Sequence, residues 1–286
     1  MKIVRTFATS ANLGPGFDCL GICFDLYNEY EFFLSDKYTI EGFSEKFSNP
    51  SDNLIVKSYE KVFLLKNKKI QFLTIRQKIQ NIPVSRGLGS SASCIVAGII
   101  MANEILGGIL SKDEIFQIAS MIEGHPDNVA PLIFGGFTCS FQEDKYHYIN
   151  LDVASNLQFF FLIPNFELST EVARASLPSC VLLEEVVSTL SHSILMVKAL
   201  EKGDFSLLKM AKKDLIHEPY RYQFIDPKKE MRKILEDYED IVGLISGAGP
   251  SILLISEQDI KNKFSIKNWQ LVSVKISNVG AYVYER

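Results

Sequence analysis

The sequence predicts an α+β fold made of two lobes. Segments with the period of an amphipathic helix and segments that read as strands follow one another without a regular strand–helix rhythm, which favours α+β over a doubly wound sheet. The 286 residues lie near the length at which one domain tends to divide into two. Hydrophobic residues make up 47% and charged residues 22% of the chain, an ordinary globular composition that can bury a large core.

The first half of the chain is predicted to begin with a strand at residues 2–8 and a turn-rich loop at residues 9–18. The loop is irregular because proline and its flanking glycines stop regular structure. A helix is expected at residues 53–65, with Ser51 or Asp52 as its amino-terminal cap.

Two further helices are expected before residue 125. The first covers residues 90–106 and ends at a pair of glycines. Ser111 and Glu114 have the spacing of a capping box, which predicts the start of the second. Gly124 ends that helix and leaves Glu123 as its last residue.

The second half shows a different pattern, which places the lobe boundary near residue 150 and the two domains at residues 1–150 and 151–286. Residues 159–163 are a continuous apolar run suited to a buried strand, and residues 180–200 fit a long helix. Two shorter helices are predicted to begin at Asp204 and at Asp226, each acting as a cap. Four more segments are predicted to be strands: residues 242–246, 252–256, 271–276 and 281–284.

Charge and cysteine usage exclude several classes of function. A net charge of −4 argues against electrostatic binding of nucleic acid, which normally needs a basic face. The sequence shows no signal-peptide pattern and no apolar run long enough to cross a bilayer, so we expect a cytoplasmic protein with no membrane partner. The five cysteines are scattered, and Cys19 and Cys23 lack a second pair of zinc ligands, so we expect free thiols.

A glycine- and serine-rich loop before the helix at Ser90 reads as an anion-binding loop. Glycines let the backbone approach a ligand closely, and the helix start offers unpaired N–H groups that hold phosphate oxygens. A nucleotide is the first hypothesis, and a serine-capped helix after a flexible turn is the alternative. No lysine follows Gly89, so backbone amides and Ser90 or Ser91 would contact the phosphates. The segment consists of Pro83, Val84, Ser85, Arg86, Gly87, Leu88, Gly89, Ser90, Ser91, Ala92 and Ser93.

Three other segments carry polar groups that core packing does not require. Asn12 and Asp18 lie in the first loop, where an Asx-turn is the alternative to a ligand site. Residues 246–251 form either a close approach to a ligand or a hairpin turn. Residues 123–131 gather four polar side chains around a proline turn, a density typical of functional loops, namely Glu123, His125, Asp127 and Asn128.

Two arginines in the second half are candidates for binding a carboxylate. Arg174 follows Thr170 closely, and Arg221 lies in a polar segment with His217. A guanidinium can grip a carboxylate with two parallel hydrogen bonds, and a surface role is the alternative for each.

Together these segments resemble the GHMP kinases, a family that includes galactokinase, homoserine kinase, mevalonate kinase and phosphomevalonate kinase. The loops at residues 9–18, 83–93 and 246–251 are similar to the three motifs of that family in order and separation. Within the family, residues 9–18, 123–131, 170–174 and 217–221 look like those of homoserine kinases. The resemblance implies a two-lobed fold, with an ATP-binding N-terminal domain, a C-terminal domain and an active site in the cleft between them.

The resemblance also implies a reaction, in which the γ-phosphoryl group of MgATP is transferred to the side-chain hydroxyl of L-homoserine for threonine biosynthesis. Residues 83–93 would wrap the triphosphate, and Asn53 would lie near the base. Ser90 or Ser91 would hold Mg²⁺ together with Glu123, because this cation prefers oxygen ligands. A homodimer is implied as well.

For the amino acid, the resemblance implies a set of complementary charges. Asp18 would pair with the ammonium group, and two arginines would clamp the carboxylate. The implied substrate-binding residues are Asn12, Asp18, Thr170, Arg174 and Arg221, and those near the reacting hydroxyl are His125, Asp127 and Asn128. Either Asp127 or the γ-phosphate would take the hydroxyl proton, and the sequence leaves both open.

Two other functions stay open. One is a GHMP kinase that acts on another small alcohol such as mevalonate, and Asp18 argues against it because mevalonate has no ammonium group. The other is a non-catalytic nucleotide-binding sensor. A sensor is expected to have a damaged metal or phosphate motif, whereas Ser91, Glu123 and Asp127 are all present.

Overall fold

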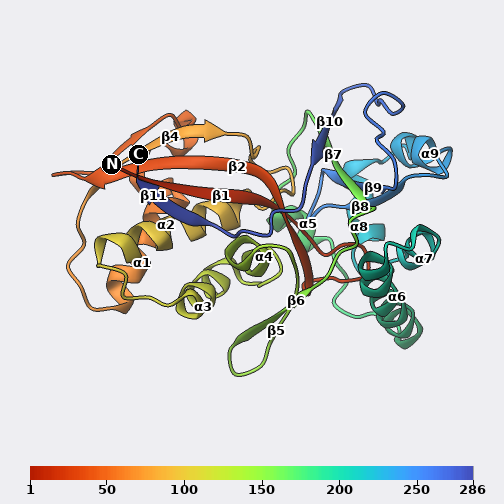
Figure 1. The fold of residues 1–286 in the computed structure, drawn as a ribbon, viewed down its shortest axis with the longest axis horizontal. Coiled ribbons are helices and arrows are strands. Elements are labelled where there is room, and N and C mark those ends of the chain that lie inside the picture. The colour runs from red at the N-terminus through yellow and green to blue at the C-terminus, as the bar shows by residue number, and fades with distance from the viewer. Residues whose placement is uncertain (286) are drawn as a thin grey trace.

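The computed structural model describes residues 1–285 and divides them between two lobes, each built on one β-sheet (Figure 1). The sheet of the first lobe has seven strands in the order β11-β1-β2-β4-β3, and β5 connects β2 to β6. All its pairs are antiparallel except β3 with β4. These strands are β1 (Lys2–Ala11), β2 (Leu20–Leu34), β3 (Thr39–Glu41), β4 (Leu73–Gln80), β5 (Phe137–Gln142), β6 (Tyr146–Leu151) and β11 (Tyr282–Glu285).

Four helices cover one face of this sheet (Figure 1). They are α1 (Leu54–Leu65), α2 (Ser90–Ile105), α3 (Lys112–Glu123) and α4 (Val129–Phe134), preceded by the short 3₁₀ helices η1 (Glu45–Phe47) and η2 (Pro50–Asp52). Helix α2 lies against both β1 and α1. Gly98 allows this close crossing, because a Cβ atom there would overlap the carbonyl of Ile55. The helix that follows the glycine loop is thereby fixed on the sheet.

The second lobe holds a four-stranded antiparallel sheet with helices on both faces. Its strands, in the order β10-β7-β9-β8, are β7 (Gln158–Pro164), β8 (Val242–Ile245), β9 (Ile252–Ser256) and β10 (Trp269–Val274). Alternate residues of β7 enter two different cores, which explains its continuous apolar run. One core includes α6 (Leu183–Lys202) and α7 (Phe205–Ala211), and the other includes α5 (Thr170–Ala175), α8 (Glu218–Ile225) and α9 (Glu230–Glu236).

The two lobes share their longest strands. Val4 of β1 and Tyr30 of β2 are buried in the core of the first lobe, whereas Ala8 and Phe24 of the same strands join the core that contains α6. The last strand, β11, returns to pair with β1, so both chain ends lie in the first lobe (Figure 1). The sheets divide between β6 and β7, while the domain boundary at residue 150 stays a prediction.

Several predicted elements are confirmed, because their signals are local. The strand at residues 2–8 lies within β1, and the helix at residues 90–106 is α2. The capping box of Ser111 is present, with its hydroxyl accepting from the N–H of Glu114. Asp204 caps α7 as predicted. None of the helices within residues 1–285 is both long and apolar enough to span a membrane.

The predicted caps of two other helices are wrong. Asn53 caps α1, with its Oδ1 accepting from the N–H of Ile55, while Ser51 and Asp52 belong to η2. Asp226 ends α8 instead of beginning a helix, and α9 starts four residues later. Its carboxylate still accepts from N–H groups at the start of α9, at 3.2 and 3.0 Å, because it reaches across the intervening turn. Helix α6 begins at Leu183, slightly later than predicted.

Candidate active site

A cavity of about 380 Å³ gathers predicted residues from both lobes. Its walls come from the loop after β1, the glycine loop before α2, the loop after α3 and the helices α5 and α8. The predicted residues that line it are Asn12, Asp18, Asn53, Val84, Ser85, Arg86, Gly87, Gly89, Ser90, Ser91, Glu123, His125, Asp127, Asn128, Thr170, Arg174 and Arg221. Segments far apart in the sequence therefore meet at one place.

Four residues of the predicted phosphate loop do not line this cavity. Leu88, Ala92 and Ser93 are fully buried behind it, and Pro83 lines a separate groove. The Oγ of Ser93 lies 2.6 Å from the Oγ1 of Thr6 on β1. Leu88, Ala92 and Ser93 therefore pack behind the loop and the start of α2 instead of facing the cavity.

The glycine loop presents the start of α2 to the cavity. Gly87 and Gly89 both have left-handed backbone angles, with φ near +72° and +71°, which glycine adopts without strain. Gly89 also has no room for a side chain, because a Cβ atom would overlap the Oγ1 of Thr9. The first N–H groups of α2, from Ser90 onward, have no partner within the helix, so they can receive an anion.

The hairpin loop between β8 and β9 locks the other loops together. The Oγ of Ser246 donates to the carbonyl of Gly87 at 2.7 Å. The carbonyl of Gly247 accepts from Asn12 Nδ2 at 2.7 Å and from Arg221 Nη1 at 2.8 Å. The segment at residues 246–251 is thus a hairpin turn that also approaches the neighbouring loops closely.

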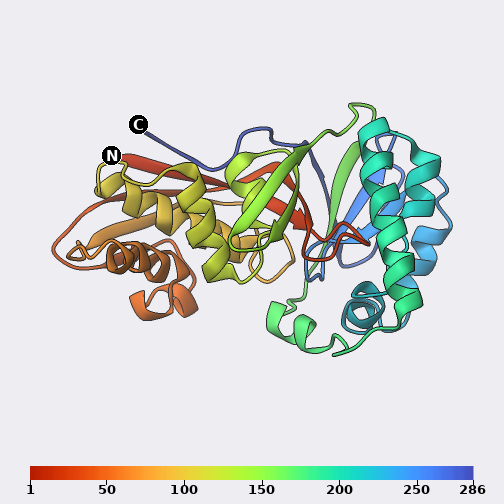
Figure 2. The same ribbon diagram turned by 90° about the horizontal axis from the view of Figure 1, so that it is seen from below.

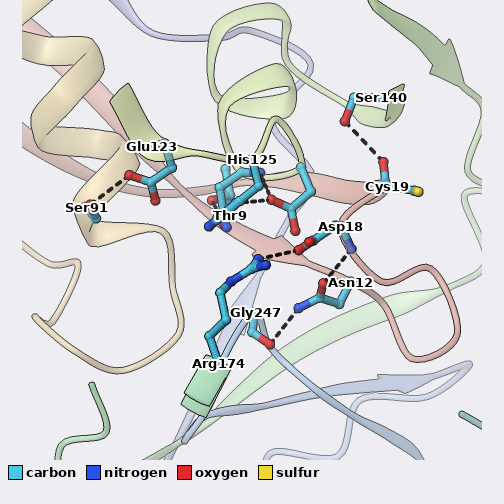
Figure 3. A network of polar contacts seen from close by, with 12 residues as sticks. Thr9, Asn12, Asp18, Cys19, Ser91, Glu123, His125, Ser140, Arg174 and Gly247 are labelled. Carbon is cyan, nitrogen blue, oxygen red and sulfur yellow. Dashed lines mark hydrogen bonds and ion pairs between the residues drawn. The ribbon is translucent and has the colours of Figure 1, made fainter. Parts of the chain in front are cut away.

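Ser91 and Glu123 form a pair at the end of the cavity next to α2 (Figure 3). The Oγ of Ser91 donates to Glu123 Oε2 at 2.8 Å. Burial raises the pKa of Glu123, and the charge of His125 and the Ser91 hydroxyl oppose this only in part. A cation at this carboxylate would offset the cost of burying its charge, and the two oxygen donors suit Mg²⁺.

His125 and Asp127 form a tight ionic contact beside that pair. The Nδ1 of His125 lies 2.6 Å from Asp127 Oδ1, which also accepts from the N–H of Asn128 at 2.9 Å. Burial lowers the pKa of His125, but the hydrogen bond and charge of Asp127 prevail and raise it to about 9. The imidazole is therefore charged at neutral pH and donates to Asp127. Thr9 donates to Asn128 Oδ1 at 2.7 Å and fixes this loop on β1.

Asp18 and Arg174 form an ion pair that lines the cavity (Figure 3). The Nη2 of Arg174, on α5, donates to Asp18 Oδ1 at 2.7 Å. The N–H of Asp18 donates to Asn12 Oδ1 at 2.9 Å. Asn12 and Asp18 both have positive φ angles, +71° and +55°, an uncommon conformation that clusters at functional sites.

Sequence reasoning missed Phe17, which organises the two arginines. The guanidinium carbons of Arg174 and Arg221 lie 5.6 and 5.4 Å from the centre of its ring. Two like charges are thus held near one aromatic ring, whose faces attract cations. Its place between Gly16 and Asp18, inside a predicted site loop, was the available signal.

Sequence reasoning also missed the far end of the cavity, which is lined from β2, β4, η1 and the loop between β3 and η1. Tyr30, Phe43 and Phe47 supply aromatic surface there, and Gln77 supplies an amide. These side chains converge only through strand pairing and the 3₁₀ turn, neither of which has a local motif. Asn53 lies nearby, but its amide group already donates to the carbonyl of Phe47 and caps α1.

Comparisons with known proteins agree with this arrangement. Residues 53–136 match the GHMP kinases N terminal domain. The chain is 41% identical to a homoserine kinase of Clostridium beijerinckii, over all of this chain and 99% of that protein. The chain belongs to the homoserine kinase branch of the GHMP kinase family.

Solved structures agree with this family membership. A homoserine kinase from Cytophaga hutchinsonii superposes with a TM-score of 0.86 at 28% identity, covering 99% of this chain and 97% of that one. A phosphomevalonate kinase of Streptococcus pneumoniae shares the fold, with a TM-score of 0.74 at 16% identity over 96% of this chain and all of the other. As a GHMP kinase, the chain is an ATP-dependent kinase with the predicted two-lobed α+β fold.

Glu218 lies buried behind the arginines of this homoserine kinase family member. Its Oε1 accepts from the N–H of Ile245 at 2.7 Å. Burial raises the pKa of Glu218 to about 8, and the charge of Asp214 adds to the increase while the Ile245 hydrogen bond opposes it. The folded protein thus favours the protonated acid.

This raised pKa predicts a pH-dependent stability. Because the folded pKa lies above the ordinary value of 4.5, Glu218 lowers the free energy of unfolding as pH rises from about 4.5 to about 8. Glu218→Gln keeps the acceptor but does not ionise. The variant should match the wild type near pH 4.5 and exceed it by about 2–5 kcal/mol at pH 9, in urea unfolding. Equal pH dependence of the two proteins would contradict the assignment.

Proposed function

We propose that this protein phosphorylates the side-chain hydroxyl of L-homoserine with ATP, giving O-phospho-L-homoserine in threonine biosynthesis within the cytoplasm. The observation that carries the proposal is the Asp18–Arg174 ion pair, which opens into the same cavity as the glycine loop. A free amino acid carries an ammonium group and a carboxylate close together, and these can pair with Asp18 and Arg174 respectively. The homoserine kinases among the relatives support this choice of substrate.

The amino acid replaces the internal ion pair with two new ones. Its ammonium group takes the place of the guanidinium at Asp18, next to Asn12. Its carboxylate pairs with Arg174 and Arg221, whose charges are otherwise held close together by Phe17. Thr170, at the start of α5, lines the same part of the cavity. Each charge of the substrate therefore finds an opposite charge in the protein.

The other end of the cavity receives ATP. Gly87, Gly89 and the N–H groups from Ser90 onward hold the phosphates, together with the flanking residues Val84, Ser85 and Arg86. Ser91 and Glu123 would hold Mg²⁺, which when bound neutralises charge on the transferred phosphoryl group. The aromatic residues beside Asn53 offer an apolar surface for the base.

Proton removal from the hydroxyl falls to Asp127 or to the γ-phosphate. Asp127 is 1% exposed, and its Oδ1 already accepts two hydrogen bonds. His125 keeps a positive charge beside it and already donates a hydrogen bond to this oxygen. Phosphoryl transfer through a loose transition state depends chiefly on position and charge, so a strong base is not required.

Asp127→Asn tests whether this carboxylate is the base. If it is, kcat should fall by about 10² to 10⁴-fold while KM for ATP changes little. Steady-state kinetics with both substrates would measure the effect, and Asp144→Asn is the matched control because that carboxylate is 85% exposed on the β5–β6 hairpin. A near-normal kcat for Asp127→Asn would assign the proton to the γ-phosphate.

The substrate itself is tested by a coupled assay of ADP release with L-homoserine, L-serine, mevalonate and galactose. Turnover should be highest with L-homoserine. Turnover only with a substrate that lacks an ammonium group would overturn the proposal in favour of another GHMP kinase. ATP binding without turnover of any alcohol would instead indicate a nucleotide sensor.

We further propose that the protein acts as a homodimer, and an exposed apolar stripe on α6 supports this. The stripe consists of Leu183, Val187, Leu190 and Ile194, each between 58% and 79% exposed. Their spacing of four, three and four residues keeps them on one side of α6. This helix runs along the second lobe (Figure 2). An antiparallel copy related by a two-fold axis places Leu183 opposite Ile194 and Val187 opposite Leu190, a self-complementary contact.

Leu190→Glu should abolish this dimer, because it places a charge at the centre of the stripe. Sedimentation or light scattering should show a dimer for the wild type and a monomer for the variant at micromolar concentration. Met121→Glu is the control, since Met121 is comparably exposed on α3 in the other lobe. A wild-type monomer, or a dimer that survives Leu190→Glu, would exclude this surface as the interface.

A further inference from the structure

His217 lies behind the arginines that face the cavity, and it is completely buried. It precedes α8, and its ring stacks on Phe17 with a centroid separation of 5.2 Å. The Nε2 of His217 lies 2.7 Å from the carbonyl oxygen of Gly14, in the first loop. Its Nδ1 lies 3.1 Å from Nη1 of Arg221. The imidazole therefore connects the loop after β1 to a guanidinium on α8.

The two partners of His217 decide its protonation state. A carbonyl oxygen can only accept, so Nε2 must carry a hydrogen. A guanidinium can only donate, so Nδ1 must be the bare, accepting nitrogen. The ring is thus the neutral Nε2–H tautomer, and protonation at Nδ1 would set two donors against each other.

The charges around the ring are consistent with this state. Burial lowers the pKa of His217 to about 4, Asp214 opposes the shift and Arg221 adds to it. The carboxylate of Asp214 lies 3.7 Å from Nε2, but it accepts from the backbone N–H groups of His217 and Glu218 at 2.8 and 2.7 Å. Asp127 contributes a weaker effect from further away.

In the described part of the chain, the guanidinium of Arg221 forms hydrogen bonds through Nη1 alone. Its Nη1 donates both to His217 Nδ1 and to the carbonyl of Gly247. Its Nε is buried and has no hydrogen-bond partner among residues 1–285, although Arg221 lines the cavity and is only 2% exposed. The unpartnered Nε is a buried donor on a residue that lines the cavity, and leaving such a donor unpaired is costly.

We infer that His217 is a positioning residue, whose accepting Nδ1 holds Nη1 of Arg221 and thereby turns the remaining edge of the guanidinium, including Nε, toward the carboxylate of the amino-acid substrate. The inference rests on the proposed function for the identity of that substrate. His217 does not touch the substrate itself. A purely structural role, through the stack on Phe17, would make different predictions for substitutions that keep only one of the two polar contacts.

Two substitutions separate the contacts of His217. In His217→Asn, Oδ1 takes about the position of Nδ1 and can still accept from Arg221. In His217→Gln, the amide reaches about the position of Nε2 and can still donate to Gly14, but Arg221 loses its acceptor. Both variants lose the ring and its stack on Phe17, so a packing role would damage them equally or damage the smaller asparagine more.

We expect KM for L-homoserine to rise by about 10-fold or more in His217→Gln, which is the effect of losing one hydrogen bond to a charged group. In His217→Asn it should stay within about 3-fold of the wild type. In both variants kcat and KM for ATP should change little. His192→Gln is the matched control, because that histidine lies on α6, where its Nδ1 hydrogen-bonds to the carbonyl of Ser188. Equal KM values for L-homoserine in the two His217 variants would overturn the inference.

A second measurement needs no variant. Nitrogen-15 NMR of the wild-type protein should find His217 as the neutral Nε2–H tautomer at pH 7, unchanged down to pH 5. A protonated ring or the Nδ1–H tautomer would overturn the inference even if the variants fail to fold. If the wild type does not phosphorylate L-homoserine, the proposed function fails, whereas the tautomer still reports on the contact with Arg221.

Discussion

The active site depends on the backbone carbonyl of Gly247, where three separate segments of the chain meet. Asn12 and Arg221 both donate to this oxygen, and the adjacent Ser246 donates to the carbonyl of Gly87. The hairpin of the second lobe is thereby fixed against the first loop and the glycine loop of the first lobe. The proposed amino-acid site is built on the first loop and the proposed ATP site on the glycine loop. The hydrogen bonds of Ser246 and Gly247 therefore fix the position of one site relative to the other.

The site also balances its charges internally. Asp18 is paired with Arg174 and Asp127 with His125, so neither carboxylate faces the cavity without an opposite charge. Glu123 differs, because within residues 1–285 its hydrogen-bond donor is the neutral hydroxyl of Ser91. The two ends of the cavity therefore differ chemically. At the end with Asp18 and Arg174, the proposed amino acid replaces an existing ion pair with two new ones. At the end with Ser91 and Glu123, the proposed cation would balance a carboxylate that has no ion-pair partner.

Motifs whose geometry depends on neighbouring residues were predictable from the sequence. Features that depend on tertiary contacts were not. The glycine loop before Ser90 and the Ser111 capping box were predictable because their geometry depends on neighbouring residues only. The cap of α1 was mispredicted, because Asn53 competed with two adjacent polar residues of equal propensity. Phe17 escaped functional assignment because the arginines near its ring lie far away in the sequence. His217 escaped it because its contact with Arg221 is local, but its burial and its contacts with Gly14 and Phe17 depend on a distant loop.

The most direct test of the interlocked loops is the kinetics of Gly87→Ala beside Gly107→Ala. Both glycines have positive φ angles, +72° and +83°, but a Cβ at Gly87 would lie 2.6 Å from the carbonyl oxygen of Gly249, while none of the described atoms lies within 4 Å at Gly107. Gly87→Ala should lower kcat/KM for ATP and for L-homoserine together, each by about 10-fold or more, the cost of a forced overlap. Gly107→Ala should leave both unchanged. A Gly87→Ala enzyme with normal kcat/KM for either substrate would contradict the claim that this contact positions both ends of the site.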